Sequence, residues 1–214
     1  MADSKLADLT EDTAPLKDDW VYKVINAGTS GSDRKVKNAR MGGWAVIAET
    51  VLGATATSVS FTSIPATYRS LKVVAQGRIS RSAARDPVMI RFNNDSSAIY
   101  YDEQLIALNT SLSGAGAAAA TSGNAGRFAA ATAPASAIGL LELVVPNYAG
   151  TTFHKGWTST SYDAQSTAAG GQDLVIIGGL WASTSAINRV DLLPSVGPDF
   201  EIGSTFTLYG LHGA

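Results

Sequence analysis

The sequence predicts an all-β protein: an antiparallel, jelly-roll-like β-sandwich preceded by an extended N-terminal arm. Three observations predict this fold. From residue 44 onward, short runs alternate apolar and polar residues with the period of two that a half-buried strand requires. Glycine, proline and asparagine separate these runs at short intervals. No long segment repeats its apolar residues with a helical period, so about ten short strands in two packed sheets are expected.

The composition suits a large β domain that buries surface in an assembly. The chain has 214 residues, which corresponds to one large domain or to one domain with an appendage. Only 16% of the residues are charged, below the ~25% of ordinary soluble proteins, and serine, threonine, glycine and alanine take their place. The formal net charge of -2 gives no general attraction to nucleic acid or to an anionic membrane, so neither partner is expected.

The sequence has no cysteine and no obvious membrane or secretion signal. The absence of cysteine excludes disulfides and thiolate metal sites. The first fifteen residues lack the apolar centre of a signal peptide, and no stretch approaches the ~20 apolar residues of a spanning helix. We therefore expect a protein that is made in the cytosol and does not leave by the general secretory route.

Residues 1–42 are predicted to be a docking arm. Charged residues are dense here and apolar residues are sparse, except in the strand candidate Trp20–Ile25, to which residues 33–36 could pair back as a hairpin. Such a segment cannot close a core of its own, so we expect it to add a strand to another surface or to thread into a groove. The large apolar side chains are the expected anchors: Leu6, Leu9, Trp20, Tyr22 and Ile25.

Residues 44–214 are predicted to form the β-sandwich. The candidate strands are Ala45–Val51, Thr57–Phe61, Leu71–Arg78, Val88–Phe92, Ile99–Leu108, Gly126–Ala131, Ile138–Val145, Thr152–Ser159, Asp173–Trp181, Ile187–Leu193 and Thr205–Leu211. The pair Gly178-Gly179 inside a strand indicates a bulge or a close approach of another group to the backbone.

Two segments depart from the strand pattern. Ser63–Ser70 is the best helical candidate and is expected to form a single turn. Residues 111–125 are of low complexity and are interpreted as a long flexible loop. The alternative is a short helix over Ala115–Ala120, which three nearby glycines oppose.

The residues available for catalysis are few, and we expect no enzyme activity. His154 and His212 lie far apart in the sequence and are interpreted as two surface imidazoles. Asp102 and Glu103 are adjacent on a predicted strand, so they point to opposite faces and cannot act as an acid and base couple. No calcium-loop spacing and no glycine-rich phosphate motif is present. No catalytic, metal-binding or cofactor-binding residue is therefore predicted.

Two features suggest ligand binding. A cluster of arginines could bind an acidic partner or a glycan; the alternative is a solvated loop in which Arg91 pairs with a carboxylate. An exposed Trp157 could stack on a sugar, because sugar C–H faces are apolar; the alternative places Trp157 in the core, as is favoured for Trp181. The arginines are Arg78, Arg81, Arg85 and Arg91, of which the first three are the candidate ligand residues.

Residues Leu6 to Tyr22 follow the pattern L-x-D-L-T-x-x-T-x-P-x-x-D-D-x-x-Y. This run resembles the opening segment of many tailed-bacteriophage virion proteins, in which it precedes a short strand. The stretch Ser32–Val36 is similar to the short Ser, Lys and Val run that often follows. In that group the segment looks like a docking arm, so the resemblance implies that other virion proteins bind it.

Four short motifs in the body, in this order, are similar to a small β module of phage tail and head appendages: Phe61–Leu71, Ile90–Asp95, Pro146–Thr151 and Ser204–Leu211. The resemblance implies a non-enzymatic virion structural protein that is assembled in the host cytoplasm. Because appendages of this kind are commonly three-fold, a homotrimer is expected. The rival interpretations are a glycan-binding adhesin for a host surface polymer, a depolymerase, and a bacterial surface subunit.

Overall fold

The computed structural model describes residues 20–23, 34–37, 43–164 and 171–212. All regular structure in these residues is β-strand, so the predicted all-β class is confirmed. The described part contains no helix that is long and apolar enough to span a membrane. The chain divides after Gly43, and Trp44–His212 forms one compact unit.

A short hairpin lies in the N-terminal part of the chain. Strands β1 (Trp20–Lys23) and β2 (Arg34–Lys37) pair antiparallel, with Trp20 opposite Lys37 and Lys23 opposite Arg34. This confirms the predicted pairing between these two segments.

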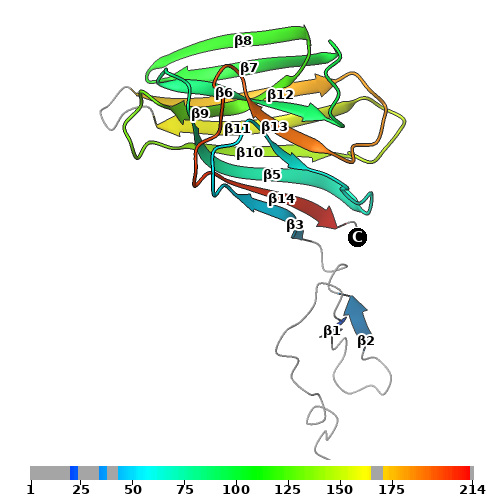
Figure 1. Cartoon of the computed structure of the whole chain (residues 1–214). Helices are drawn as coiled ribbons and strands as arrows, with labels where there is room; N and C mark the ends of the chain where they lie inside the picture. Colours follow the sequence, from blue (N-terminus) through cyan, green and yellow to red (C-terminus); the bar gives the residue numbers. More distant parts are fainter. Residues whose placement is uncertain (1–19, 24–33, 38–42, 165–170, 213–214) are drawn as a thin grey trace, which may run out of the picture. The chain divides into compact units, whose positions relative to one another are not determined.

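The compact unit is a sandwich of two sheets (Figure 1). Eight of its twelve strands form the larger sheet and four form the smaller one, whose strand β9 packs across β10, β11 and β12. In spatial order, the larger sheet consists of β3 (Trp44–Val51), β14 (Thr205–His212), β5 (Tyr68–Ile79), β10 (Gly139–Pro146), β11 (Lys155–Ala164), β12 (Gln172–Trp181), β7 (Tyr100–Leu108) and β8 (Ser111–Ala120). The smaller sheet consists of β4 (Val59–Phe61), β13 (Val190–Pro194), β6 (Arg85–Phe92) and β9 (Gly123–Ala130).

Strand β5 belongs to both sheets. Most of its length pairs antiparallel with β14 and β10 in the larger sheet. Its last two residues, Arg78 and Ile79, pair parallel with Ala129 and Ala130 of β9 in the smaller sheet. Every other strand pairing among the described residues is antiparallel, so the predicted antiparallel sandwich is confirmed apart from this one parallel pairing.

The hydrophobic core lies between the two sheets and follows from alternation. In β10, Leu141, Leu143 and Val145 are buried, whereas the residues between them face solvent. In β6, Val88, Ile90 and Phe92 are buried in the same way from the other side. Each such side chain gains roughly 1.5–3 kcal/mol on leaving water, so the alternation fixes which face of each strand turns inward.

An aromatic cluster fills one end of the core. The ring of Phe92 lies 5.8 Å from that of Trp157 and 5.7 Å from that of Trp181, measured between centroids. Tyr100 packs beside them; its hydroxyl accepts a hydrogen bond from the Phe92 amide (3.0 Å) and donates one to the Asp95 carbonyl (3.1 Å). Burial raises the pKa of Tyr100 to about 12.

The loop predicted over residues 111–125 is wrong, and so is its helical alternative. Residues 111–120 form β8, which pairs antiparallel with β7, and β9 begins at Gly123. The strand is held by backbone hydrogen bonds to β7. Its side chains are exposed on both faces, so no apolar alternation is needed and none marks the strand in the sequence.

Two further predictions need correction. Ser63–Ser70 contains no helix: residues 66 and 67 form a turn, β5 starts at Tyr68, and the hydroxyl of Tyr148 donates a hydrogen bond to the Pro65 carbonyl. The strand predicted over Thr152–Ser159 begins instead at Lys155 and continues to Ala164.

Candidate functional site

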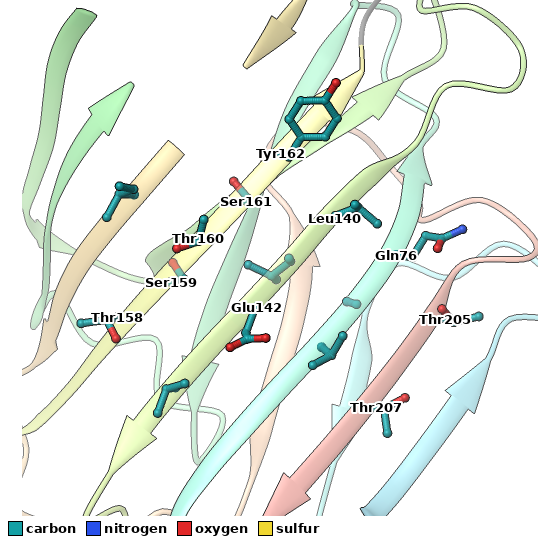
Figure 2. Close-up of a pocket in the computed structure, with 15 residues that line it drawn as sticks. Gln76, Leu140, Glu142, Thr158, Ser159, Thr160, Ser161, Tyr162, Thr205 and Thr207 are labelled. Atoms are coloured by element: carbon teal, nitrogen blue, oxygen red, sulfur yellow. The ribbon is translucent and has the colours of Figure 1, made fainter. Parts of the chain in front are cut away.

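The outer face of the larger sheet contains a shallow hollow of about 630 Å³ (Figure 2). It spans β14, β5, β10 and β11 and reaches β12. Strand alternation builds it, since every second side chain of these strands points away from the core. Its solvent-facing lining consists of Val74, Gln76, Leu140, Glu142, Val144, Thr158, Thr160, Tyr162, Ile176, Thr205 and Thr207.

Strand register aligns these side chains in two neighbouring rows. The first, the Tyr162 row, runs Thr205, Gln76, Leu140, Tyr162 and Leu174. The second, the Glu142 row, runs Thr207, Val74, Glu142, Thr160 and Ile176. Hydroxyl groups therefore lie on β14 and on β11, the amide of Gln76 lies on β5, and the rows end in the apolar side chains Leu174 and Ile176 of β12.

Glu142 supplies the negative charge of the hollow. Its carboxylate lies 3.8 Å from the ammonium of Lys72, and its side chain is 58% exposed. The Lys72 ammonium lies 4.9 Å from the Trp44 ring centroid and 5.7 Å from that of Tyr209. An exposed ion pair of this kind contributes at most about 1 kcal/mol, so Glu142 can exchange it for hydrogen bonds to a ligand.

The lining of the hollow also includes an aromatic ring and apolar side chains that are partly exposed. Tyr162 is 38% exposed, and Leu140 and Ile176 are exposed to a similar extent. The apolar surface continues outward along the sheet through Leu174 and Leu105. The exposed ring offers an apolar face for stacking, and the hydroxyl groups and the carboxylate beside it offer hydrogen-bond partners.

Arg78, one of the predicted ligand residues, has a structural role. Its guanidinium donates hydrogen bonds to four backbone carbonyls, those of Ala131, Ala133, Pro134 and Ala137. Its Nε also lies 3.3 Å from a carboxylate oxygen of Glu201. Because these contacts use its donors, Arg78 fastens residues 131–137 to β5 and is not free to bind a ligand.

Arg81 and Arg85 lie together, with Arg127, around a second hollow of about 610 Å³. Arg81 Nη1 lies 2.7 Å from Asp86 Oδ1, and both Arg85 and Arg127 contact Asp173. Asp86 and Asp173 are fully buried, so the arginines neutralise carboxylates that would otherwise be costly to bury. The structure therefore joins two of the three predicted arginines but gives each an internal partner.

The alternative interpretation of the arginine cluster paired Arg91 with a carboxylate. Arg91 does not pair with a carboxylate through its Nε; this atom donates to the Thr121 carbonyl at 3.0 Å. Arg127 was not singled out in the sequence, because it stands alone in a segment of small residues, and only the pairing of β9 with β6 brings it to Arg85.

Trp157 is a core residue, and the prediction that it stacks on a sugar is wrong. It is 2% exposed, and its indole nitrogen donates to the Asn124 carbonyl at 3.1 Å. Gly179 lies against its ring, which confirms a close approach at the glycine pair. The favoured core position of Trp181 is confirmed as well; its indole donates to Asp95 at 2.9 Å.

The predicted arm anchors are only partly covered by the structure. Leu6, Leu9 and Ile25 lie outside the described residues. Trp20 and Tyr22 lie on β1, for which the backbone pairing alone is described. Their role as anchors stays a prediction.

The residues considered for catalysis are dispersed. His154 lies in an exposed loop, and His212 packs against Tyr68 with ring centroids 4.9 Å apart. Asp102 is buried and Glu103 is exposed, which confirms that they point to opposite faces. Within residues 43–164 and 171–212, no three histidine or acidic side chains are grouped so that they could hold a metal ion.

The residues of the hollow were not predicted. The alternating hydroxyls Thr158, Thr160 and Tyr162 are a recognisable signal, but the predicted strand ended at Ser159 and covered only part of it. Thr205 and Gln76 meet because β14 pairs with β5, and no local pattern encodes that neighbourhood.

No protein-family model and no curated protein matches the chain. Among solved structures, galectin LEC-6 of Caenorhabditis elegans is 8% identical over 77% of this chain and 96% of its own, with a TM-score of 0.29. The structure of infectious bursal disease virus, Gt strain, is 13% identical over 87% of this chain and 46% of that one, with a TM-score of 0.15. These TM-scores are too low to support a functional or evolutionary inference.

Proposed function

We propose that this chain is a non-enzymatic structural subunit of a virion, which attaches through residues 1–42 and displays the sandwich. The division of the chain into two units after Gly43 is the observation that carries this proposal. The N-terminal resemblance to tailed-bacteriophage virion proteins supports it, as does the β1–β2 hairpin, a preformed strand pair that suits docking by strand addition.

The contacts of the buried carboxylates support a structural role for the sandwich. Asp86 accepts hydrogen bonds from the amides of Val196 and Gly197 in addition to its contact with Arg81. Asp102 accepts a hydrogen bond from the Asn124 amide at 3.1 Å. These side chains fasten loops and strands to one another, which is the use expected in a rigid displayed module.

Deleting residues 1–42 tests the attachment. The truncated protein is expected to fold but to be absent from purified particles, because the groups that dock are gone. Many copies attached through arms would dissociate slowly as a set, so the full-length protein is expected to stay bound when the particles are washed. Full-length Gly178→Ala, changed at an open position of the body, is the matched control. Retention of the truncated protein on particles at the full-length level contradicts the proposal. The homotrimer stays a prediction.

A second candidate function is glycan binding in the hollow of the larger sheet. It is favoured by one observation, the half-exposed Tyr162 ring beside Glu142 and a set of threonine hydroxyls. A volume of about 630 Å³ lies within the range of small-molecule sites, and its openness to solvent suits a stretch of polymer. The ligand that fits is a neutral oligosaccharide, because the hollow carries one carboxylate and its lining contains no unpaired cation.

Screening the full chain on a glycan array, followed by titration calorimetry of the best ligand, tests this function. Tyr162→Ala is expected to weaken binding at least tenfold through loss of ring stacking. Tyr101→Ala removes an equally exposed tyrosine outside the hollow and is expected to leave binding unchanged. Equal losses in both variants, or no ligand on a broad array, would overturn the candidate.

A further inference from the structure

Strand β8 is the open edge of the larger sheet (Figure 1). It pairs with β7 on one side, and none of the described strands pairs with its other side. All its residues are exposed except Ala120, which is partly buried, so both faces of the strand are open as well. A row of backbone donors and acceptors ten residues long therefore faces solvent.

The composition of β8 leaves this edge without the usual protection. Proteins generally guard edge strands with charges, proline, bulges or short length. β8 has no charged residue and no proline, and its irregularity lies at one end, near Ala119, where φ is +52°. By contrast, the other edge strand of this sheet carries the exposed Glu49, and β4 is only three residues long.

β8 also gains little from its own side chains. Alanine and glycine have low strand propensity, and ordering glycine costs more backbone entropy than ordering any other residue. With pairing on one side and no buried face, the strand lacks most sources of stabilisation. A second set of backbone hydrogen bonds along the free side would provide stabilisation that the side chains of β8 do not provide.

We propose that β8 pairs antiparallel with β8 of a second copy of this chain, about a two-fold axis. Because the strand is uncharged, it can meet itself without electrostatic repulsion. The small side chains of Gly114 to Ala117 allow close approach, and the pairing shields Leu112, which is 73% exposed. A two-fold contact also closes on itself, whereas pairing of β8 with β3 would leave a free edge at each end and continue as a fibre.

The size of the contact sets its strength. Ten residues span about 34 Å, and a strip about 10 Å thick buries roughly 700 Å² in total. Specific stable interfaces bury ~1,200–2,000 Å², so the pair is weak between free chains. Arms attached side by side on a particle would raise the effective concentration of the sandwiches to about millimolar and populate the contact. That last step rests on the proposed attachment; the pairing itself does not.

The absence of cysteine makes a disulfide scan decisive. Single cysteines are placed, one per variant, at each residue from 113 to 117 of the full chain, with Ala54→Cys in an exposed loop as the matched control. In a two-fold antiparallel pair, equivalent residues meet only at the axis, and each step away separates them by about 7 Å. Disulfides need Cα atoms ~4.4–6.8 Å apart, so one position is expected to cross-link at least tenfold faster than its neighbours and than Ala54→Cys.

A charge on the edge completes the test. If Ala115→Cys gives the fastest cross-linking, adding Ala117→Lys to that variant is expected to slow the reaction at least tenfold. Adding Ala54→Lys to the same variant is expected to leave the rate unchanged. Uniform rates at all positions, or faster cross-linking between Ala115→Cys and Val46→Cys of β3 than between two β8 cysteines, overturns the proposal. Because the scan is read in solution, a failure of particle attachment does not affect it, and a negative scan leaves the attachment assay unaffected.

Discussion

Trp157 occupies space that two glycines leave open. A Cβ atom at Gly179 would lie 2.0 Å from the indole ring, and one at Gly123 would lie 2.2 Å from it. The ring is held by its hydrogen bond to Asn124 and by packing against Phe92, so it has little freedom to move aside. The identity of these two glycines is thus set by one aromatic side chain on another strand.

Gly179→Ala is expected to lower the free energy of unfolding by about 3 kcal/mol or more, since the added methyl group overpacks a rigid part of the core. Gly178→Ala is the matched control on the same strand, because a Cβ there meets nothing within 4 Å. It should change stability by no more than about 0.5 kcal/mol. Urea unfolding followed by tryptophan fluorescence measures both, and equal effects would contradict the packing account.

The stability of the protein should depend on Tyr100 at alkaline pH. In the unfolded chain a tyrosine ionises near pH 10, whereas burial raises the pKa of Tyr100 to about 12 in the folded protein. Its contribution is therefore complete below about pH 10 and is lost as the pH rises to about 12. Wild type is expected to lose up to about 3 kcal/mol from this group over that interval.

Tyr100→Phe isolates this effect, because it keeps the ring and removes the titrating hydroxyl. At neutral pH the variant should be less stable by about 1–2 kcal/mol, having lost hydrogen bonds to Phe92 and Asp95. Its deficit relative to wild type should shrink between about pH 10 and about pH 12. A deficit that stays constant over this range in denaturant titrations would show that the buried hydroxyl is not the titrating group.

Among the elements, the segment 131–137 depends on β5 for its order. Arg78→Met removes donors to four carbonyls and is expected to cost about 2–3 kcal/mol. Amide hydrogen exchange in residues 131–137 should accelerate at least tenfold. Arg69→Met, at an exposed position of the same strand, should leave both stability and exchange unchanged. Unaltered exchange in the Arg78 variant would contradict the fastening role.

Elements with strong alternation were predictable, and elements defined by their neighbours were not. β5 and β14 show apolar residues at every second position, and both were predicted close to their observed bounds. β8 shows no alternation, because its side chains all face solvent and its existence depends on the register with β7. The predicted start of β11 was three residues early, because residues 152–154 lie in an exposed loop before the strand.

The candidate site could not be predicted for a related reason. Gln76 and Thr205 occupy the same row of the hollow, yet they are brought together only by the pairing of β5 with β14. The alternation within β11 predicts which side of that strand a hydroxyl occupies, but not which strand lies beside it. Non-local pairing is thus the information that the sequence pattern lacks.

For the whole molecule, the compact unit Trp44–His212 is expected to be stable on its own. Because its buried residues pack against one another, removing residues 1–43 should shift the urea midpoint of the body by less than experimental error. Tryptophan fluorescence reports this directly, since Trp157 and Trp181 remain in the core. Aggregation or early unfolding of the truncated protein would show that the body needs its N-terminal segment.

The position of β14 between β3 and β5 has a consequence for biosynthesis. β3 is made first among the strands of the sandwich, yet its pairing partner β14 is made last. During translation the apolar strand β3 therefore stays unpaired until almost the entire sandwich has left the ribosome. Closing such distant contacts is slow. A nascent chain with an unpaired strand can misassemble during most of its synthesis. We therefore expect its folding to benefit from chaperones that shield unpaired strands.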